Sequence, residues 1–477
     1  MNVAVRRHFD RFELEEAART LRAQGGRMIM LYAAPEAGGT QSVRYVSSRA
    51  GIGFDIWVVP ADTAIPSLAT IWPLLGWYER ETADHRGIVF SGQPEPFSLI
   101  APLRSAEEAD LRRLPDISGD AVQILPFGPV RAGVVESAEF SFFYIGEAIL
   151  HYVPHLFLKH RGMEDRFTGQ TPETGLVLAE RISGVGSAAH ALAYSQAIEA
   201  AAGVTVPDRV RYQRVIVAEL ERLYNHLHYL GHLADTTTLK VGHAEGVLLA
   251  ERVKQINARV TGSRFLRGVI APGGMRRDLR IDGLASALDE LRQPIRKYIN
   301  RLDASESYFD RLATTGLLPR EIAFDQGATG PVARASGLDR DLRRDHTYAA
   351  YADPDLAFSV ATHETGDADA RARVRIAEIE NSIVMIQRAI TLTPTGKIRI
   401  PCLPSPNSEA LGWAESPRGT LIYAVHFGED GRLARVKIKS PSFSNWRVFP
   451  YTVHNTNMMD YAINEASFGL TIAGCAR

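Results

Sequence analysis

The sequence predicts an α+β protein with a small N-terminal α/β domain (residues 1–115) and a large, mainly α-helical domain (residues 116–477) with β elements at both ends. Three observations support this fold class. The first domain contains several short runs of β-branched and aromatic residues, which are typical of strands. Apolar residues recur at helical spacing over most of 175–392, and alternating patterns typical of strands lie on both sides of that helical region. A chain of 477 residues is long enough for two or three domains.

In the first domain, residues 9–26 have helical spacing and end at a glycine pair, which predicts a helix. A second helix is expected to end in WYERE, residues 77–81. The polar stretch 105–122 predicts a linker to the second domain. Three strands are expected between the helices, at 27–34, 43–48 and 54–60.

In the second domain, strands are expected over 125–160 and again over 421–443, where GEDG predicts a hairpin turn. The segment between them is periodic in the helical manner. Its expected helices lie within 187–203, 207–239, 244–262, 283–312 and 367–392. We find no internal repeat.

Composition excludes several classes of function. A net charge of −1 gives no reason to expect nucleic acid as a partner, and the basic clusters interleave arginine with aspartate. Cys402 and Cys475 lie too far apart for a disulfide framework or a local zinc or iron–sulfur site, which favours a reducing, cytoplasmic compartment. The N-terminus lacks a signal-peptide core. The most apolar window, 140–158, carries Glu147, two histidines and a proline, so we expect strands there and no direct membrane span.

The segment RISGVGSAAH, residues 181–190, consists mostly of residues with small side chains and leads into a helix that we expect to be buried. Small residues there allow another backbone to approach closely. The second interpretation is that larger groups belong at these positions and have been replaced.

Several motifs resemble known families. GWYERETADHRGIVF resembles the hallmark segment of the smaller peripheral-arm (30-kDa-like) subunit of respiratory complex I. Motifs of the second domain resemble the quinone-site (49-kDa-like) subunit of complex I and the large subunit of energy-converting NiFe hydrogenases. They are HRGME, RVTGSRF, GGMRRD, GATGPVARASG, GDADAR, ESPRG and RVKIKSPSFSNW. Both modules in this order resemble the large subunit of formate hydrogenlyase and hydrogenase-4 type complexes.

The resemblance implies a degenerate metal site. Active members carry R-x-C-G-x-C-S-x-x-H, and both cysteine positions of that pattern fall here on Ser183 and Gly186. A second pattern, D-P-C-x-x-C-x-x-R, puts its cysteines on Thr471 and Gly474. A nickel–iron centre needs soft thiolates, which hydroxyls and glycine cannot replace. No metal is therefore expected in this chain.

The same resemblance bears on quinone. In the complex I subunit, a histidine after a Gly-Pro turn and a tyrosine in the first pattern are associated with the quinone headgroup. Those positions fall here on Val135 and Gly184. Quinone stays possible only in another pose.

Four further residues are candidates for the cavity lining. Arg181 and His190 could hold a carbonyl or an anion, and the alternative, which we favour for His190, is a structural hydrogen bond to a buried backbone carbonyl. By resemblance, Arg418 is expected near the cavity that holds the metal in active members of the family, where it either lines the cavity or forms a buried ion pair. Glu164 is either part of a proton path or a salt-bridged carboxylate.

Three functions follow from the resemblance. The first is a catalytically silent subunit of a complex I-like or formate hydrogenlyase-like assembly on the cytoplasmic face of the inner membrane. It would dock an iron–sulfur small subunit, which would carry the clusters, and couple to proton-pump-like membrane subunits. The second is an electron-transfer subunit that passes electrons to quinone through a remodelled pocket. The third is an effector-binding module. No strand–GxGxxG–helix is found, so NAD(H) would need another subunit.

Overall fold

The N-terminal sheet has the strand order β1-β4-β3-β2, in which only the β1 pairing with β4 is parallel. Its strands are β1 (Val5–His8), β2 (Arg27–Pro35), β3 (Gln41–Arg49) and β4 (Gly53–Pro60). The helices α1 (Leu14–Ala23) and α2 (Leu75–Arg86) and the short strands β5 (Ile65–Pro66) and β6 (Phe90–Ser91) complete this domain. The computed structural model describes residues 4–36, 39–49, 53–100, 115, 117, 119–130 and 136–477.

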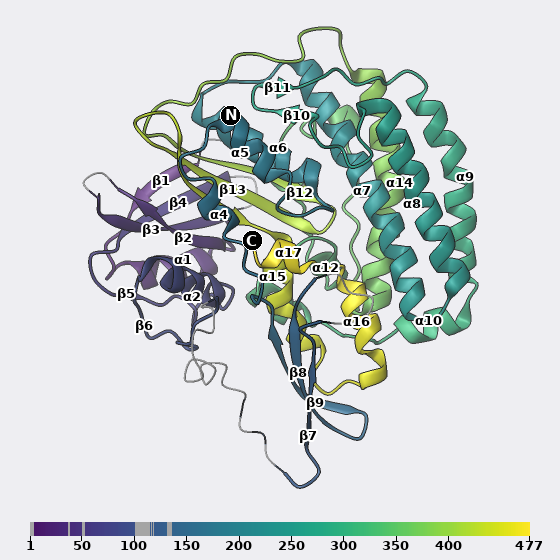
Figure 1. Ribbon diagram of the computed structural model, residues 1–477, viewed down its shortest axis with the longest axis horizontal. Coiled ribbons are helices and arrows are strands. Elements are labelled where there is room, and N and C mark those ends of the chain that lie inside the picture. Colours follow the sequence, from purple (N-terminus) through teal and green to yellow (C-terminus); the bar gives the residue numbers. More distant parts are fainter. Residues whose placement is uncertain are drawn as a thin grey trace.

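The second domain is built on the long helix α7 (Asp208–Thr236), which packs against α8 (Lys240–Thr261) and α14 (Ala368–Leu392). Figure 1 shows these helices with α9 (Leu284–Asp303) on the side of the molecule away from the N-terminal sheet. The other helices are α4 (Met163–Arg166), α5 (Pro172–Ala179), α6 (Ser187–Ala201), α10 (Glu306–Leu312), α11 (Arg320–Asp325), α12 (Gly330–Ala335), α13 (Leu342–Asp345), α15 (Pro441–Val448), α16 (Tyr461–Phe468) and α17 (Ile472–Cys475).

A three-stranded antiparallel sheet lies between the helices and the N-terminal domain (Figure 1). It consists of β12 (Glu409–Ser416), β13 (Gly419–Phe427) and β14 (Leu433–Lys439). Helix α6 packs on β12 and β13 and comes so close that a Cβ atom on Gly412 would lie 2.1 Å from the Ala193 carbonyl oxygen. The short pair β10 (Ile270–Ala271) and β11 (Gly274–Met275) packs against the same helix.

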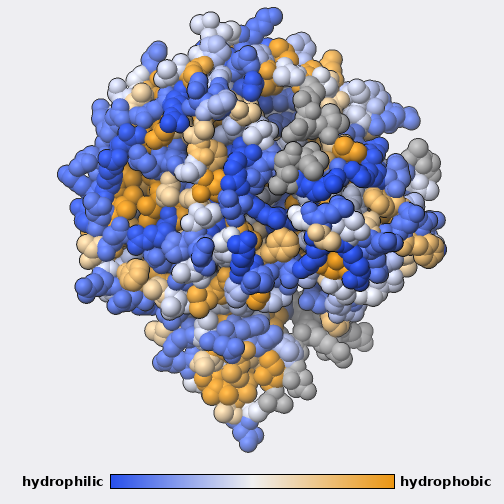
Figure 2. Space-filling view, turned by 180° about the vertical axis from the view of Figure 1, so that it is seen from behind, coloured by the Kyte–Doolittle hydropathy of each residue, from blue (hydrophilic) through white to orange (hydrophobic). Residues whose placement is uncertain are grey.

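A second three-stranded sheet projects from the body of the molecule. It contains β7 (Gln123–Phe127), β8 (Glu139–Ile145) and β9 (Ala148–His155). Every residue of β7 is exposed, including Ile124, and Val130 beyond it is 88% exposed. Figure 2 shows an apolar patch over this projection. Among the described residues, no helix is both long enough and apolar enough to cross a bilayer.

Buried ion pairs join the two domains. Glu409 of β12 contacts Arg44 of β3 at 3.2 Å, and Glu81 of α2 contacts Arg477 at 3.0 Å. Because lone buried charges are costly, these pairs make the relative position of the domains specific. Glu81 of the WYERETAD segment therefore packs the two domains together, whereas Asp84 of the same segment accepts backbone N–H groups within its own domain.

The predicted α+β class is confirmed, with differences at the ends of elements. The helix expected to end in WYERE begins at Leu75 and continues to Arg86, because Gly87 supplies the left-handed residue that ends it. Strands β1 and β12 were not predicted from the sequence. Much of the expected linker at 105–122 lies outside the described residues, so the domain boundary stays a prediction.

Candidate functional site

The structure brings together the four positions that resemble metal-ligand positions. Ser183 and Gly186 precede α6, and Thr471 and Gly474 lie at α17. All four line one small cavity with His190 of α6 and Arg418 of the turn between β12 and β13. The volume of this cavity is about 20 Å³. That space holds about one water molecule.

Helix α7 fixes the loop on the first side of the cavity. The Glu221 carboxylate accepts the backbone N–H groups of Ala188 and Ala189 at 2.7 and 2.9 Å, which satisfies the start of α6. One turn later, the Asn225 amide donates to the Val185 carbonyl at 2.9 Å. Burial raises the pKa of Glu221 to about 7, so this carboxylate can carry a proton at neutral pH.

Arg418 points its guanidinium at neutral acceptors. Its Nε donates to the Gly469 carbonyl at 2.7 Å, and one terminal nitrogen donates to the Asn225 side-chain oxygen at 2.8 Å. Burial, followed by the charge of Arg375, lowers the pKa of Arg418 to about 10. Within the described part of the chain, Arg418 forms no ion pair. The ion-pair alternative is wrong because Glu221 is occupied by the backbone of α6.

His190 is held by a tyrosine. Its Nδ1 lies 2.8 Å from the hydroxyl oxygen of Tyr423 on β13, and its side chain is buried. Burial lowers the pKa of His190 to about 3, so the imidazole is neutral at physiological pH. The structural interpretation that we favoured named a backbone carbonyl as the partner. That partner was wrong, because the side chain of β13 that faces His190 is the phenol of Tyr423.

Short side chains and their mutual hydrogen bonds close the second side of the cavity. The Thr471 hydroxyl accepts the Gly474 backbone N–H at 3.1 Å and lies 3.1 Å from the Ser442 hydroxyl. The Glu136 carboxylate accepts the Ala473 backbone N–H at 2.9 Å. A Cβ atom on Gly474 would lie 2.7 Å from the Thr471 hydroxyl oxygen, so little room is left at this position.

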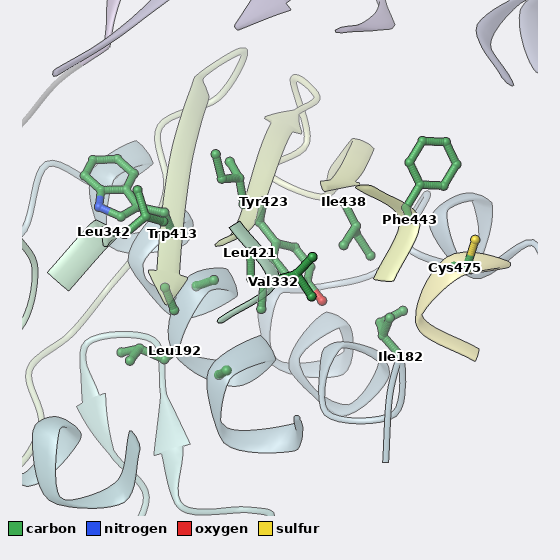
Figure 3. Packing of buried hydrophobic residues seen from close by; sticks show 14 of the residues in the cluster. Ile182, Leu192, Val332, Leu342, Trp413, Leu421, Tyr423, Ile438, Phe443 and Cys475 are labelled. Atoms are coloured by element: carbon green, nitrogen blue, oxygen red, sulfur yellow. The ribbon is translucent and has the colours of Figure 1, made fainter. Parts of the chain in front are cut away.

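The donor atoms around the cavity do not fit a nickel–iron centre. Such a centre requires thiolates, and these positions supply two hydroxyls and two glycines. Cys475 belongs instead to the buried hydrophobic cluster with Ile182 and Phe443 (Figure 3). Burial raises the pKa of the Cys475 thiol well above its ordinary value. Across the described ranges, His, Cys, Asp and Glu form no group of three or more that could hold a metal ion.

Several candidate residues do not line the cavity. Arg181 is exposed and donates to the Val177 carbonyl at 2.8 Å, because the chain turns outward before the loop. Gly184 is exposed as well. Glu164 lies in the domain interface, where it accepts from Arg477 at 2.9 Å and from Arg435 at 3.1 Å, as the salt-bridged alternative expects. Val135 lies outside the described residues.

Sequence reasoning missed the residues that hold the site in place. Glu221 and Asn225 are four residues apart on α7, so they share one helical face. A carboxylate and an amide at that spacing within the predicted helix were the available signal. Tyr423 and Glu136 gave no local signal, since each reaches the site from a distant segment.

The buried neutral state of His190 makes the stability of the protein depend on pH. The pKa of His190 is about 3 in the folded protein and 6.5 for the free side chain. The unfolded chain therefore binds a proton first as the pH falls below 6.5, and folding stability declines. We expect His190 to contribute a loss of about 1.4 kcal/mol per pH unit in this window. Urea unfolding at several pH values measures it, with H190Q as the reference, because other buried histidines act in the same direction. Equal slopes for both proteins would contradict the assignment.

The sequence matches three protein families. "Respiratory-chain NADH dehydrogenase, 30 Kd subunit" covers residues 8–113, "Nickel-dependent hydrogenase" covers 161–246, and "Respiratory-chain NADH dehydrogenase, 49 Kd subunit" covers 246–403 and 399–477. The fold is therefore that of a hydrogenase-like large subunit joined to a 30-kDa-subunit-like domain.

Relatives span most of the chain. Formate hydrogenlyase subunit 5 of Escherichia coli is 29% identical and covers 92% of this chain and 82% of its own length. The carbon monoxide-induced hydrogenase of Rhodospirillum rubrum is 32% identical and covers 68% of this chain and 90% of its own length. NADH-quinone oxidoreductase subunit 4 of Thermus thermophilus is 30% identical, with 68% and 86% covered.

The chain belongs to the family of large subunits of membrane-bound, energy-converting hydrogenases, to which the complex I quinone-site subunits are related. A chain of the archaeal membrane-bound sulfane sulfur reductase, a respiratory membrane complex, has the same fold. The TM-score is 0.70 at 23% identity, and the match covers 75% of this chain and 99% of that one.

Proposed function

We propose that this chain is a metal-free, hydrogenase-like subunit of a membrane-associated redox complex of the complex I or formate hydrogenlyase type. One observation carries the proposal. The four positions that correspond by resemblance to cysteine ligands hold Ser183, Gly186, Thr471 and Gly474, and they surround a cavity with room for about one water molecule.

The hydrogen bonds around the cavity support this proposal. Glu221 and Asn225 fix one loop, and Thr471 and Ser442 tie down the other without any metal. Replacing the thiolates by small residues therefore gives a packed site rather than a large void, which agrees with the cost of empty volume in proteins. The subunit then contributes its shape and its interfaces instead of metal chemistry.

The partners that we propose are an iron–sulfur small subunit and proton-pump-like membrane subunits, on the cytoplasmic face of the inner membrane. The relatives are named as subunits of membrane-bound hydrogenases and NADH-quinone oxidoreductases, which supports the membrane partner. The projecting sheet offers a surface for it, since exposed apolar side chains in a group are typical of interaction sites. Ile124 and Val130 lie on this projection.

The quinone alternative has weaker support. Ligand pockets for molecules of that size usually have volumes of about 300–1,000 Å³, far above the space open to water in this cavity. His190 and Tyr423 bind each other, so neither is free to meet a headgroup without a rearrangement. An effector that fits the cavity would have to be about as small as water.

Affinity purification from detergent-solubilised membranes of the native host, through a tag on this chain, tests the proposal. We expect iron–sulfur and membrane subunits to co-purify, and we expect quinone reduction, where present, to survive the H190Q substitution. Purification of the chain alone would contradict the subunit role. Quinone turnover abolished by H190Q in an assembled complex would favour the electron-transfer alternative.

The apolar projection gives a prediction with a matched control. The double variant I124E/V130E places two charges on the projecting surface, where their desolvation opposes burial against an apolar partner. We expect it to fold normally and to lose co-purification of the membrane subunits. V241E is the control, because Val241 is also exposed (71%) but lies at the start of α8. Equal recovery of membrane subunits with both variants would rule out this docking surface.

A further inference from the structure

A second small cavity lies at the interface of the two domains. Arg27 of β2 and Tyr78 of α2 line it from the N-terminal domain. Lys439 at the end of β14, Arg447 and Ser444 of α15, and Gln326 line it from the other domain. The cavity is separate from the one formed by Ser183 and Thr471, and it shares no lining residue with it.

The polar side chains of this interface cavity are cationic. Arg27, Lys439 and Arg447 all face it, and among the residues that the structure describes no carboxylate lines it. Three neighbouring cations without a counter-charge repel one another strongly at low dielectric. The buried charges at Glu81 and Glu409, by contrast, are all paired.

Several hydrogen-bonding atoms around this cavity have no protein partner. The buried Nε atoms of Arg27 and Arg447 donate to nothing in the described chain, and Lys439 gives one of its three N–H groups to the Ser444 hydroxyl at 2.7 Å. The Gln326 side-chain oxygen is also buried without a partner. Turning that amide by 180° would present its NH₂ group to the cavity as another donor.

The carboxylates that act on these cations from neighbouring elements are bound elsewhere. Glu415 acts on Arg27 and Lys439, but it is paired with Arg334 at 3.0 Å. Glu79 acts on Arg447, but it accepts hydrogen bonds from Ser67 and from the Leu68 backbone. Burial raises the pKa of both carboxyls to about 7, and both groups are already bound by these other partners.

Other charged groups near the cavity strengthen the positive field. Burial, followed by the charge of Arg340, lowers the pKa of Arg27 to about 9. Burial, followed by the charge of Arg27, lowers the pKa of Lys439 to about 7, so this amine is only partly protonated at neutral pH. Burial, together with the charge of Arg80, lowers the pKa of Arg447. Glu95 acts on Arg447 in the opposite sense, but it is paired with Arg80 at 2.7 Å. The cavity therefore combines unneutralised positive charge with unused N–H donors.

The size of the cavity selects the ligand. The volume of the cavity is about 10 Å³, which is room for one small particle and too little for a tetrahedral oxyanion. We propose that this interface cavity binds a single monatomic anion, chloride under physiological conditions, held by Arg27, Lys439 and Arg447 and joining the two domains. A water molecule would use the same donors but would leave the charges of Arg27 and Arg447, and the partial charge of Lys439, unneutralised.

Anomalous diffraction locates such an anion directly. Crystals of the full chain are soaked in sodium bromide, and data are collected at the bromine absorption edge. We expect an anomalous peak between Lys439 and Arg447. An ordinary water peak without anomalous signal at this place would overturn the proposal.

A measurement in solution tests the same site independently. We expect the Tm of the full chain to rise by a few degrees and to saturate with sodium chloride, but not with sodium gluconate of equal ionic strength. The R447Q variant should lose most of this chloride-specific shift. R388Q is the matched control, because Arg388 is an exposed arginine that donates to the Ala357 carbonyl. Equal Tm curves in the two salts would also overturn the proposal, whatever the folding of R447Q.

Discussion

The R334M variant is expected to lose about 3–5 kcal/mol of unfolding free energy, the usual cost of breaking a buried ion pair. Arg334 of α12 has no exposed surface. It contacts Glu415 at 3.0 Å and Asp341 at 3.3 Å, and it also pairs with Glu378 of α14. Methionine preserves much of the volume but leaves three carboxylates without this partner. The loss of positive charge, rather than a cavity, is therefore the dominant effect.

Chemical unfolding in urea at pH 7 measures this change, with R344M as the control. Arg344 forms ion pairs with Asp339 and Asp345, but its side chain is 41% exposed, so its pairs are screened by water. We expect R344M to change the stability by less than about 1 kcal/mol. Similar values for the two variants would show that the buried network contributes no more than a surface pair.

The G412A variant is expected to lose about 3 kcal/mol, at the upper end of the cost of overpacking. The added Cβ atom would lie 2.1 Å from the Ala193 carbonyl oxygen and 2.3 Å from the Ala197 nitrogen. Both are backbone atoms of α6, so no side chain can turn away. Strand β12 and α6 must therefore separate, and α6 carries His190.

Thermal and urea unfolding measure the effect, and G184A serves as the control. A Cβ atom on Gly184 would meet only the Arg267 guanidinium, at 3.6 Å, an ordinary contact. We expect G184A to stay within about 0.5 kcal/mol of the wild type, as exposed substitutions usually do. A G412A variant as stable as G184A would mean that the sheet and the helix are less closely packed than described.

Sequence patterns predicted the fold well because the long elements repeat their signals. The apolar spacing over 207–239 and 367–392 marks α7 and α14, which are among the longest helices. Strand β12 escaped because EALGWAES lies buried along nearly its whole length and shows little alternation. Strand β1 has four exposed residues and pairs with β4, far along the chain, so it carries no local signal.

The candidate site was harder to predict, and the reason is physical. Arg181 and Gly184 belong to the same motif as Ser183, yet both are exposed, because the chain turns within that short loop. Spacing in a motif does not say which way each side chain faces. Whether Arg418 meets a carboxylate or a carbonyl depends on segments far apart in sequence.

The direct test of the central claim is the nickel content of the complex, isolated through this chain from cells grown with nickel and measured by mass spectrometry of the metals. The account predicts iron from the partner subunits and nickel at background, both in the wild type and in an S183A control. The donors at Ser183, Gly186, Thr471 and Gly474 include no thiolate. About one nickel per copy of this chain would contradict the account, and it would require a ligand set other than these four residues.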